Sequence, residues 1–163
     1  MPVTPAAIDD AVSRTVAIAG LAGVAAIHVL QLPDAFSETF YLGMLFIGAA
    51  VASLLVATAL TRTSGHGVWT AAVALPALIL LGYVLSRTSG LPDATNDVGE
   101  WDEPLGLASL VAETLVVCVG GVVLAAGRAP MSAMRAFPGA GSVRQRRRAA
   151  ALGLLDGRER AAE

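Results

Sequence analysis

Polar side chains interrupt the apolar stretches of the chain at a few positions, and these are the residues that could do chemistry. Glu113 lies inside one apolar stretch, Arg87 ends another, and His28 and Gln31 lie near the end of a third. A carboxylate within a membrane costs a few kcal/mol and normally faces a helix bundle's interior beside a partner. Because a guanidinium can bind a carboxylate through two hydrogen bonds, we expect Arg87 to pair with Glu113.

The polar cluster of His28, Gln31, Arg87 and Glu113 has three interpretations. The Arg87–Glu113 pair can fix helix register and hold the adjoining loop, the cluster can bind a ligand, proton or metal, or the residues never meet. Metals usually take three or four protein ligands, and one His with one Glu is a poor set. His66 falls at the opposite side of the membrane, which argues against a haem held between two helices. We therefore expect no metal and no cofactor.

The segment from Arg87 to Glu103 is the most acidic part of the chain. It contains four carboxylates that could hold a divalent cation, namely Asp93, Asp97, Glu100 and Asp102. Their spacing lacks the regularity of a calcium-binding loop. Solvation of an exposed acidic loop is therefore the favoured interpretation.

The composition assigns the chain to the membrane. Of its 163 residues, 55% are hydrophobic and 15% charged, with a mean hydropathy of +0.68, whereas soluble domains carry about 25% charged residues. The apolar blocks have the ~20 residues that cross a ~30 Å hydrocarbon layer. We predict an all-α polytopic membrane protein, a bundle of four transmembrane helices over about 13–32, 39–60, 68–86 and 104–127.

Prolines and aromatic residues refine these spans. Pro5 argues against an earlier helix start, and Pro33 predicts a stop followed by a short polar link. Pro76 lies inside the third span and predicts a kink. Trp69 and Tyr83 are assigned to the two membrane interfaces, where aromatic rings are enriched.

The basic tail over 128–163 carries eight Arg against three acidic residues. Its densest run contains Arg144, Arg146, Arg147 and Arg148. This run either contacts anionic lipid headgroups, at about 1 kcal/mol per Arg, or only determines topology. With four spans, ten Arg lie on the side of both termini and Arg87 alone on the other. The positive-inside rule then places both termini in the cytoplasm and the acidic loop outside.

Several segments resemble a known group of proteins. They cover 83–92, 99–101 and 104–110, which read YVLSRTSGLP, GEW and PLGLASL, together with Glu113, His28, Pro33 and Phe36. The pattern resembles an uncharacterised group of small four-helix integral membrane proteins from high-GC Gram-positive bacteria. The likeness covers the four spans and leaves out the tail. It implies a four-helix fold in the bacterial cytoplasmic membrane, and no activity.

Two functions are consistent with these patterns. Small residues in the second and fourth spans allow close helix packing and favour an accessory or scaffold subunit that packs against itself or a membrane partner. The alternative is a small oligomeric permease or channel for a proton, cation or metal, built around the polar cluster. A membrane-embedded redox or metal enzyme is a weaker hypothesis, because no catalytic motif is present. We expect no nucleic-acid partner for a tail held at the membrane.

Overall fold

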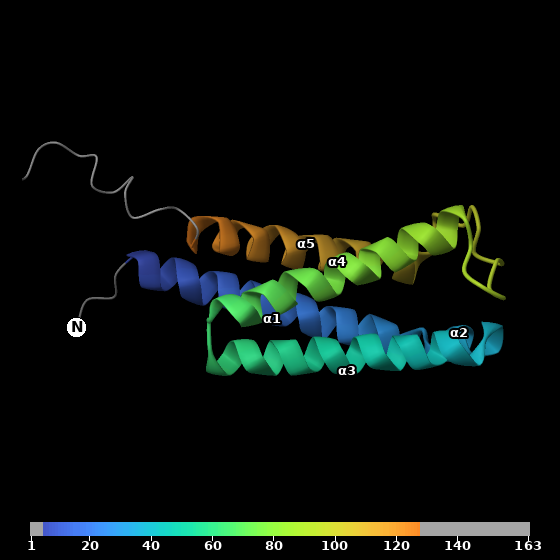
Figure 1. Cartoon of the computed structure of the whole chain (residues 1–163), viewed down its shortest axis with the longest axis horizontal. Helices are drawn as coiled ribbons and strands as arrows, with labels where there is room; N and C mark the ends of the chain where they lie inside the picture. Colours follow the sequence, from blue (N-terminus) through green and yellow to red (C-terminus); the bar gives the residue numbers. More distant parts are fainter. Residues whose placement is uncertain (1–4, 128–163) are drawn as a thin grey trace, which may run out of the picture. The chain divides into compact units, whose positions relative to one another are not determined.

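The computed structural model describes residues 5–127, and for 5–8 the backbone alone. The helices are α1 (Pro5–Leu30), α2 (Leu32–Glu38), α3 (Phe40–Arg62), α4 (His66–Thr88) and α5 (Pro104–Gly127) (Figure 1). Four of them, all but α2, are long and apolar enough to cross a membrane. The predicted all-α, four-span architecture is confirmed. The tail Arg residues predicted to contact lipid lie outside the described part of the chain.

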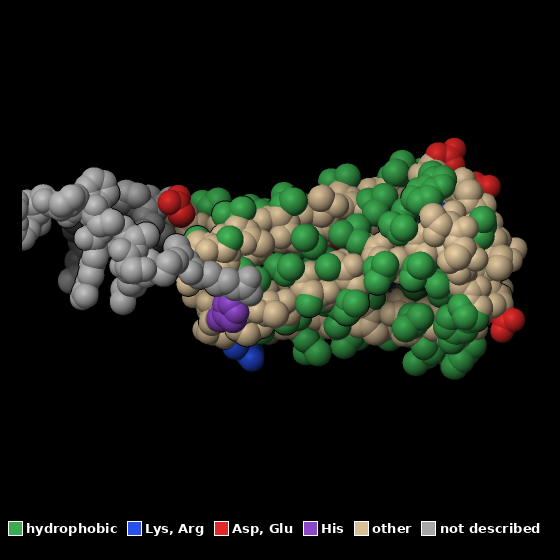
Figure 2. Space-filling model, turned by 45° about the horizontal axis from the view of Figure 1, so that its top comes forward, with side chains coloured by type: hydrophobic (Ala, Val, Ile, Leu, Met, Phe, Trp, Pro, Cys, Tyr) green, Lys and Arg blue, Asp and Glu red, His purple; other side chains and the backbone are tan. Residues whose placement is uncertain are grey.

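The surface of the bundle suits a lipid environment. Large apolar side chains are widely exposed along the sides, and Val111 and Val122 of α5 are 70% and 69% exposed. Apolar side chains cover the sides, whereas charged side chains gather at the two ends (Figure 2). The protein is therefore a multi-pass membrane protein.

Two details of the predicted boundaries are wrong. α1 begins at Pro5 and not near residue 13, because proline is favoured in a helix's first turn, where its missing N–H would have no partner. The polar link expected after Pro33 is the short helix α2, with Pro33 in its first turn. α3 then begins after Thr39, whose side chain accepts a hydrogen bond from the Leu42 N–H at 3.4 Å.

The four long helices differ in how closely they pack. α1 packs against α3 and α5, and α4 packs against α5, whereas α3 and α4 share less contact. α3 ends and α4 begins at the link 63–65, and the two helices separate toward the other end (Figure 1). We call the end with this link the link end, and the end with the segment 89–103 the loop end.

The apolar core lies toward the link end. Its buried members come from all four long helices: Ala17, Leu21, Ala57, Leu60, Trp69, Ala72, Val116 and Leu124. Trp69, predicted to lie at a membrane interface, has a side chain that is 2% exposed and packs within this core. Gly120 leaves room for Val73 of α4, whose Cγ2 lies 2.6 Å from where a Cβ would be. Nearby, the Arg14 guanidinium donates to the Leu60 carbonyl and ties α1 to the end of α3.

The loop between α4 and α5 is folded onto the bundle. Gly90, in the left-handed region at φ +73°, ends α4, as glycine commonly does. Leu91 and Ala94 exchange two backbone hydrogen bonds of 2.9 and 3.0 Å. The Tyr41 hydroxyl donates to the Pro92 carbonyl at 2.5 Å, and Ala94 is buried beside Leu42. The loop is thereby fixed to α3.

Candidate functional site

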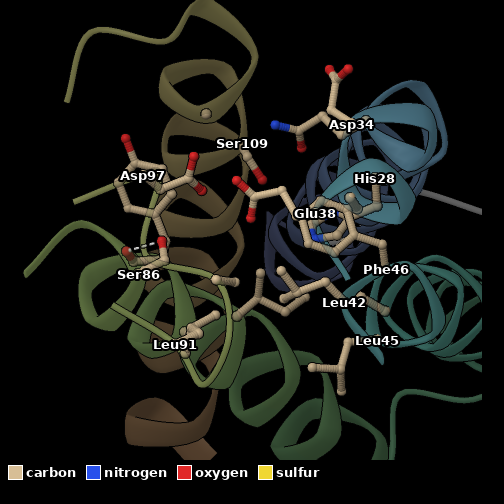
Figure 3. A pocket seen from close by; sticks show the side chains of 18 of the residues that line it. His28, Asp34, Glu38, Leu42, Leu45, Phe46, Ser86, Leu91, Asp97 and Ser109 are labelled. Atoms are coloured by element: carbon tan, nitrogen blue, oxygen red, sulfur yellow. Dashed lines mark hydrogen bonds between the residues drawn. The ribbon is translucent and has the colours of Figure 1, made fainter. Parts of the chain in front are cut away.

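A cavity of about 770 Å³ occupies the loop end of the bundle. Side chains from α1, α3, α4, α5 and the loop face it, among them His28, Phe46, Asp97 and Ser109 (Figure 3). Its volume lies within the ~300–1,000 Å³ typical of small-molecule sites.

The cavity exists because α3 and α4 leave the bundle interior there. α3 has no buried residue over 44–49, and α4 has none over 77–86. The buried residues of α4 lie on either side of this interval, from Trp69 to Pro76 and then at Arg87. Pro76, which cannot donate to the carbonyl one turn earlier, marks the boundary between the packed part of α4 and the part that lines the cavity.

Glu113 of α5 lies on the cavity wall and is 1% exposed. The Ser109 hydroxyl, one turn earlier, donates to its Oε1 at 2.6 Å. Its Oε2 has no hydrogen-bond partner within residues 5–127. A buried carboxyl oxygen without a partner is costly, so Glu113 is equipped to bind a group placed in the cavity.

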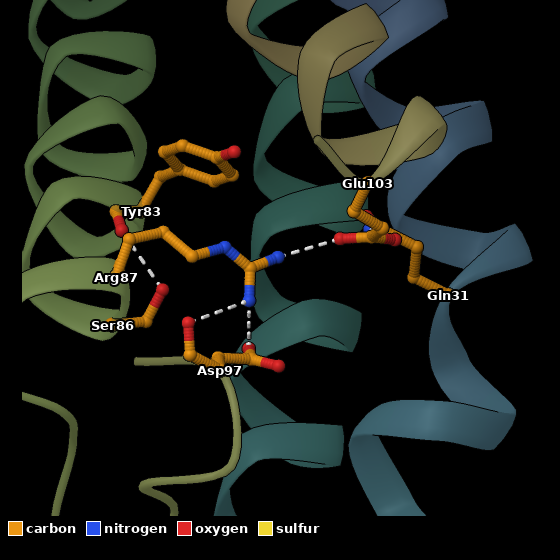
Figure 4. A network of polar contacts seen from close by, with 6 residues as sticks. All are labelled: Gln31, Tyr83, Ser86, Arg87, Asp97 and Glu103. Atoms are coloured by element: carbon orange, nitrogen blue, oxygen red, sulfur yellow. Dashed lines mark hydrogen bonds and ion pairs between the residues drawn. The ribbon is translucent and has the colours of Figure 1, made fainter. Parts of the chain in front are cut away.

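Arg87 is paired with carboxylates of the loop. Its Nη1 lies 2.7 Å from Asp97 Oδ2, and its Nη2 lies 2.6 Å from Glu103 Oε2. Glu103 also accepts a hydrogen bond from Gln31 Nε2 at 3.0 Å, so the network joins α4, the loop and the junction between α1 and α2 (Figure 4). The guanidinium lies 5.1 Å from the centre of the Tyr83 ring. Tyr83, expected at the membrane interface, thus lines the cavity.

The predicted Arg87–Glu113 pair is wrong. Glu113 lies nine residues into α5, about 13 Å along its axis, whereas Glu103 directly precedes the helix. Arg87, at the last turn of α4, is nearer in depth to Glu103 and pairs with it.

The other two members of the predicted cluster also reach the cavity. His28 is buried, and its Nδ1 donates to the Val24 carbonyl at 2.9 Å. Its ring packs against Phe46 with centroids 5.0 Å apart. His28, Gln31, Arg87 and Glu113 thus all line one cavity, in three separate hydrogen-bond groups. Their role in binding stays a prediction.

The loop carboxylates do not form a common cation site. Asp97 is used by Arg87, and of the other three only Glu100 lines the cavity, whereas Asp93 and Asp102 do not. Within the described residues, no three His, Cys, Asp or Glu side chains are arranged to hold a metal ion.

The cavity lining is strongly acidic. Among residues 5–127, one guanidinium, that of Arg87, lines the cavity with six carboxyl groups: Asp34, Glu38, Asp97, Glu100, Glu103 and Glu113. Apolar walls of low dielectric strengthen the field of such groups. The lining therefore favours a cation over an anion.

Sequence reasoning missed Ser109 and Glu103 as members of the site. Ser109 could have been found by its position four residues before Glu113, since residues at this spacing are neighbours on a helix.

Comparison of the chain with protein families, curated proteins and solved structures finds no match.

Proposed function

We propose that the protein is a non-enzymatic accessory subunit of the bacterial cytoplasmic membrane whose loop-end cavity binds a small organic cation. The observation that carries this proposal is the Glu113 carboxyl group, buried on the cavity wall with Oε2 unpartnered. A cationic ligand would place its positive charge, and C–H or N–H groups polarised by that charge, against this oxygen.

The walls suit an organic cation better than a bare ion. Aromatic rings of Phe46 and Tyr83 and apolar side chains such as Leu75 and Ile79 line much of the cavity. Aromatic rings attract cations through the negative potential of their faces. A small metal ion would need several oxygen or nitrogen ligands at one point, which this lining does not gather.

The distribution of Arg supports an orientation with both termini in the cytoplasm. The loop end then faces outward, and the cavity takes its ligand from the outer side of the membrane.

A permease or channel for a proton or cation is the second candidate. The buried carboxyl of Glu113 favours it, because such groups mark ion and proton pathways in membranes. Leu21, Leu60, Trp69 and Val116 of the core fill the interior toward the link end, so transport would require a second conformation or an assembly. The binding function needs neither.

The test is binding of tetraphenylphosphonium to the full chain in phosphatidylcholine nanodiscs. We expect Glu113→Gln to weaken binding at least tenfold, about 1.4 kcal/mol, because the amide removes the charge and keeps the shape. Asp102→Asn is the matched control, since it removes one negative charge from the loop at a residue that does not line the cavity.

The uncharged tetraphenylsilane, which has the same shape and no hydrogen-bonding atom, should bind the two variants and the wild type equally. Equal tetraphenylphosphonium affinity in wild type and Glu113→Gln would overturn the proposed site.

A further inference from the structure

We infer that the ligand is a cationic amphiphile with one hydrocarbon chain, and that this chain reaches the cavity sideways from the bilayer, between α3 and α4. The inference rests on the proposed function and names its ligand class. We call the gap lined by Met44, Leu45 and Gly48 of α3 and Leu78, Ile79 and Gly82 of α4 the seam.

The polarity of the cavity is divided between its walls. Every lining residue of α3 is apolar, and so is every lining residue of α4 up to Gly82. The carboxyl groups come from α2, α5 and the segment 97–103. A ligand that satisfies both walls has a positively charged head and an apolar body.

The seam connects the cavity with the lipid-facing surface. Leu45 and Leu78 line the cavity, yet they are 59% and 66% exposed, so each side chain borders both the cavity and the outside of the bundle. A Cβ added at Gly48 or Gly82 would meet no atom within 4 Å. The two facing helices thus leave open space at the same place.

The depth of the seam matches the hydrocarbon layer. Leu78 lies nine residues before Arg87, about 13 Å along α4, and Arg87 lies at the end of this apolar helix. A chain passing beside Leu78 therefore lies among acyl chains. Its head would lie at Glu113, which is nine residues into α5 and so at about the same depth as Leu78.

The experiment uses dodecyltrimethylammonium with a diazirine at the chain end, photolysed with the full chain in phosphatidylcholine nanodiscs. We expect the diazirine to label residues 44–48 and 78–82. In Gly82→Leu or Gly48→Leu, whose new side chains fill the seam, the labelling yield at these residues should fall at least fivefold. Gly121→Leu is the matched control, because its Cβ also meets no atom within 4 Å and it lies outside the cavity.

The outcomes separate this inference from the proposed function. If tetraphenylphosphonium binding depends on Glu113 but the label spreads equally over Val111 and Val122 of α5, entry of the hydrocarbon chain through the seam is wrong, whereas the cation site stands. If Gly82→Leu changes the mass of the particle, a second copy of the chain fills the seam, which also overturns the inference. If neither probe responds to Glu113→Gln, the proposed function itself fails.

Discussion

Glu113 and Arg87 are both buried in a membrane-spanning bundle, but their charges are compensated differently. Arg87 has a carboxylate on each of two nitrogens, whereas Glu113 has a single hydroxyl donor and one oxygen without a partner. Insertion of an ionised side chain at a helix centre costs roughly 2.5–3.5 kcal/mol. Arg87, in the last turn of α4, has contacts that offset its burial and hold the loop. Within residues 5–127, Glu113 has no hydrogen bond or ion pair to another helix.

Arg87→Gln should loosen the loop. Removing one member of a buried ion pair costs about 3–5 kcal/mol, but Asp97 and Glu103 are 42% and 36% exposed, so we expect about 1–2 kcal/mol. Hydrogen exchange at the Gly99 N–H, which donates to the Arg87 carbonyl, should then quicken about tenfold.

The same measurement contains its control. The Thr63 N–H, which donates to the Ala59 carbonyl at the link end, should exchange as in the wild type. Arg62→Gln removes an exposed Arg at that end and should leave the loop unchanged. Unchanged Gly99 exchange in Arg87→Gln would show that the ion pairs do not hold the loop.

The sequence predicted which polar residues share one end of the bundle but not which of them pair. Depth along a helix follows from residue number. This depth predicted that His28, Gln31, Arg87 and Glu113 lie toward the same end of the bundle. Pairing depends on how each helix is rotated and on competing partners. Glu103, assigned to the loop by its position before Pro104, lies closer in depth to Arg87 and therefore pairs with it.

At the scale of elements, α4 changes its role along its length. Before Pro76 it packs into the core through Trp69 and Ala72, and after Pro76 it lines the cavity. Such packing in lipid depends on small residues that let backbones approach. Gly120 of α5 provides this approach, whereas its neighbour Gly121 faces open space.

This difference predicts unequal effects of two adjacent substitutions. In Gly120→Ala the new Cβ would lie 2.6 Å from Cγ2 of Val73, a stiff β-branched side chain. We expect overpacking to cost about 1–3 kcal/mol, measured as the free energy of unfolding in mixed micelles. Gly121→Ala should be neutral or slightly stabilising. Equal loss in the two variants would show that helix packing at Gly120 is not the cause.

The elements themselves were largely predictable, and the exceptions concern proline. Four blocks of apolar residues gave four helices, because hydropathy over about 20 residues has few alternative explanations. Pro5 and Pro33 were interpreted as signals against helix, yet both lie in the first turn of one. The same residue type favours a helix start and ends a preceding helix, and local sequence does not decide between these effects.

At the scale of the molecule, charge is divided between the ends of the bundle. The acidic cavity lies at the loop end, and Arg14 and Arg62 lie at the link end, on the side to which the termini belong. An acidic surface attracts cations and raises their local concentration. The orientation in the membrane therefore decides which compartment supplies the ligand.

Single cysteines test the proposed orientation. With Cys118 replaced by Ala, Asp102→Cys at the loop end and Ser64→Cys at the link end each provide one exposed thiol. Four spans would put ten of the eleven Arg on the side of the link end, which the positive-inside rule assigns to the cytoplasm. We therefore expect a membrane-impermeant maleimide to label Asp102→Cys in intact bacterial cells. Ser64→Cys should react only after the cells are permeabilised. Its reaction at that point shows that the thiol at residue 64 is reactive and that the membrane had protected it. The reverse pattern would place the acidic end of the cavity in the cytoplasm, and its cation would then be a cytoplasmic one.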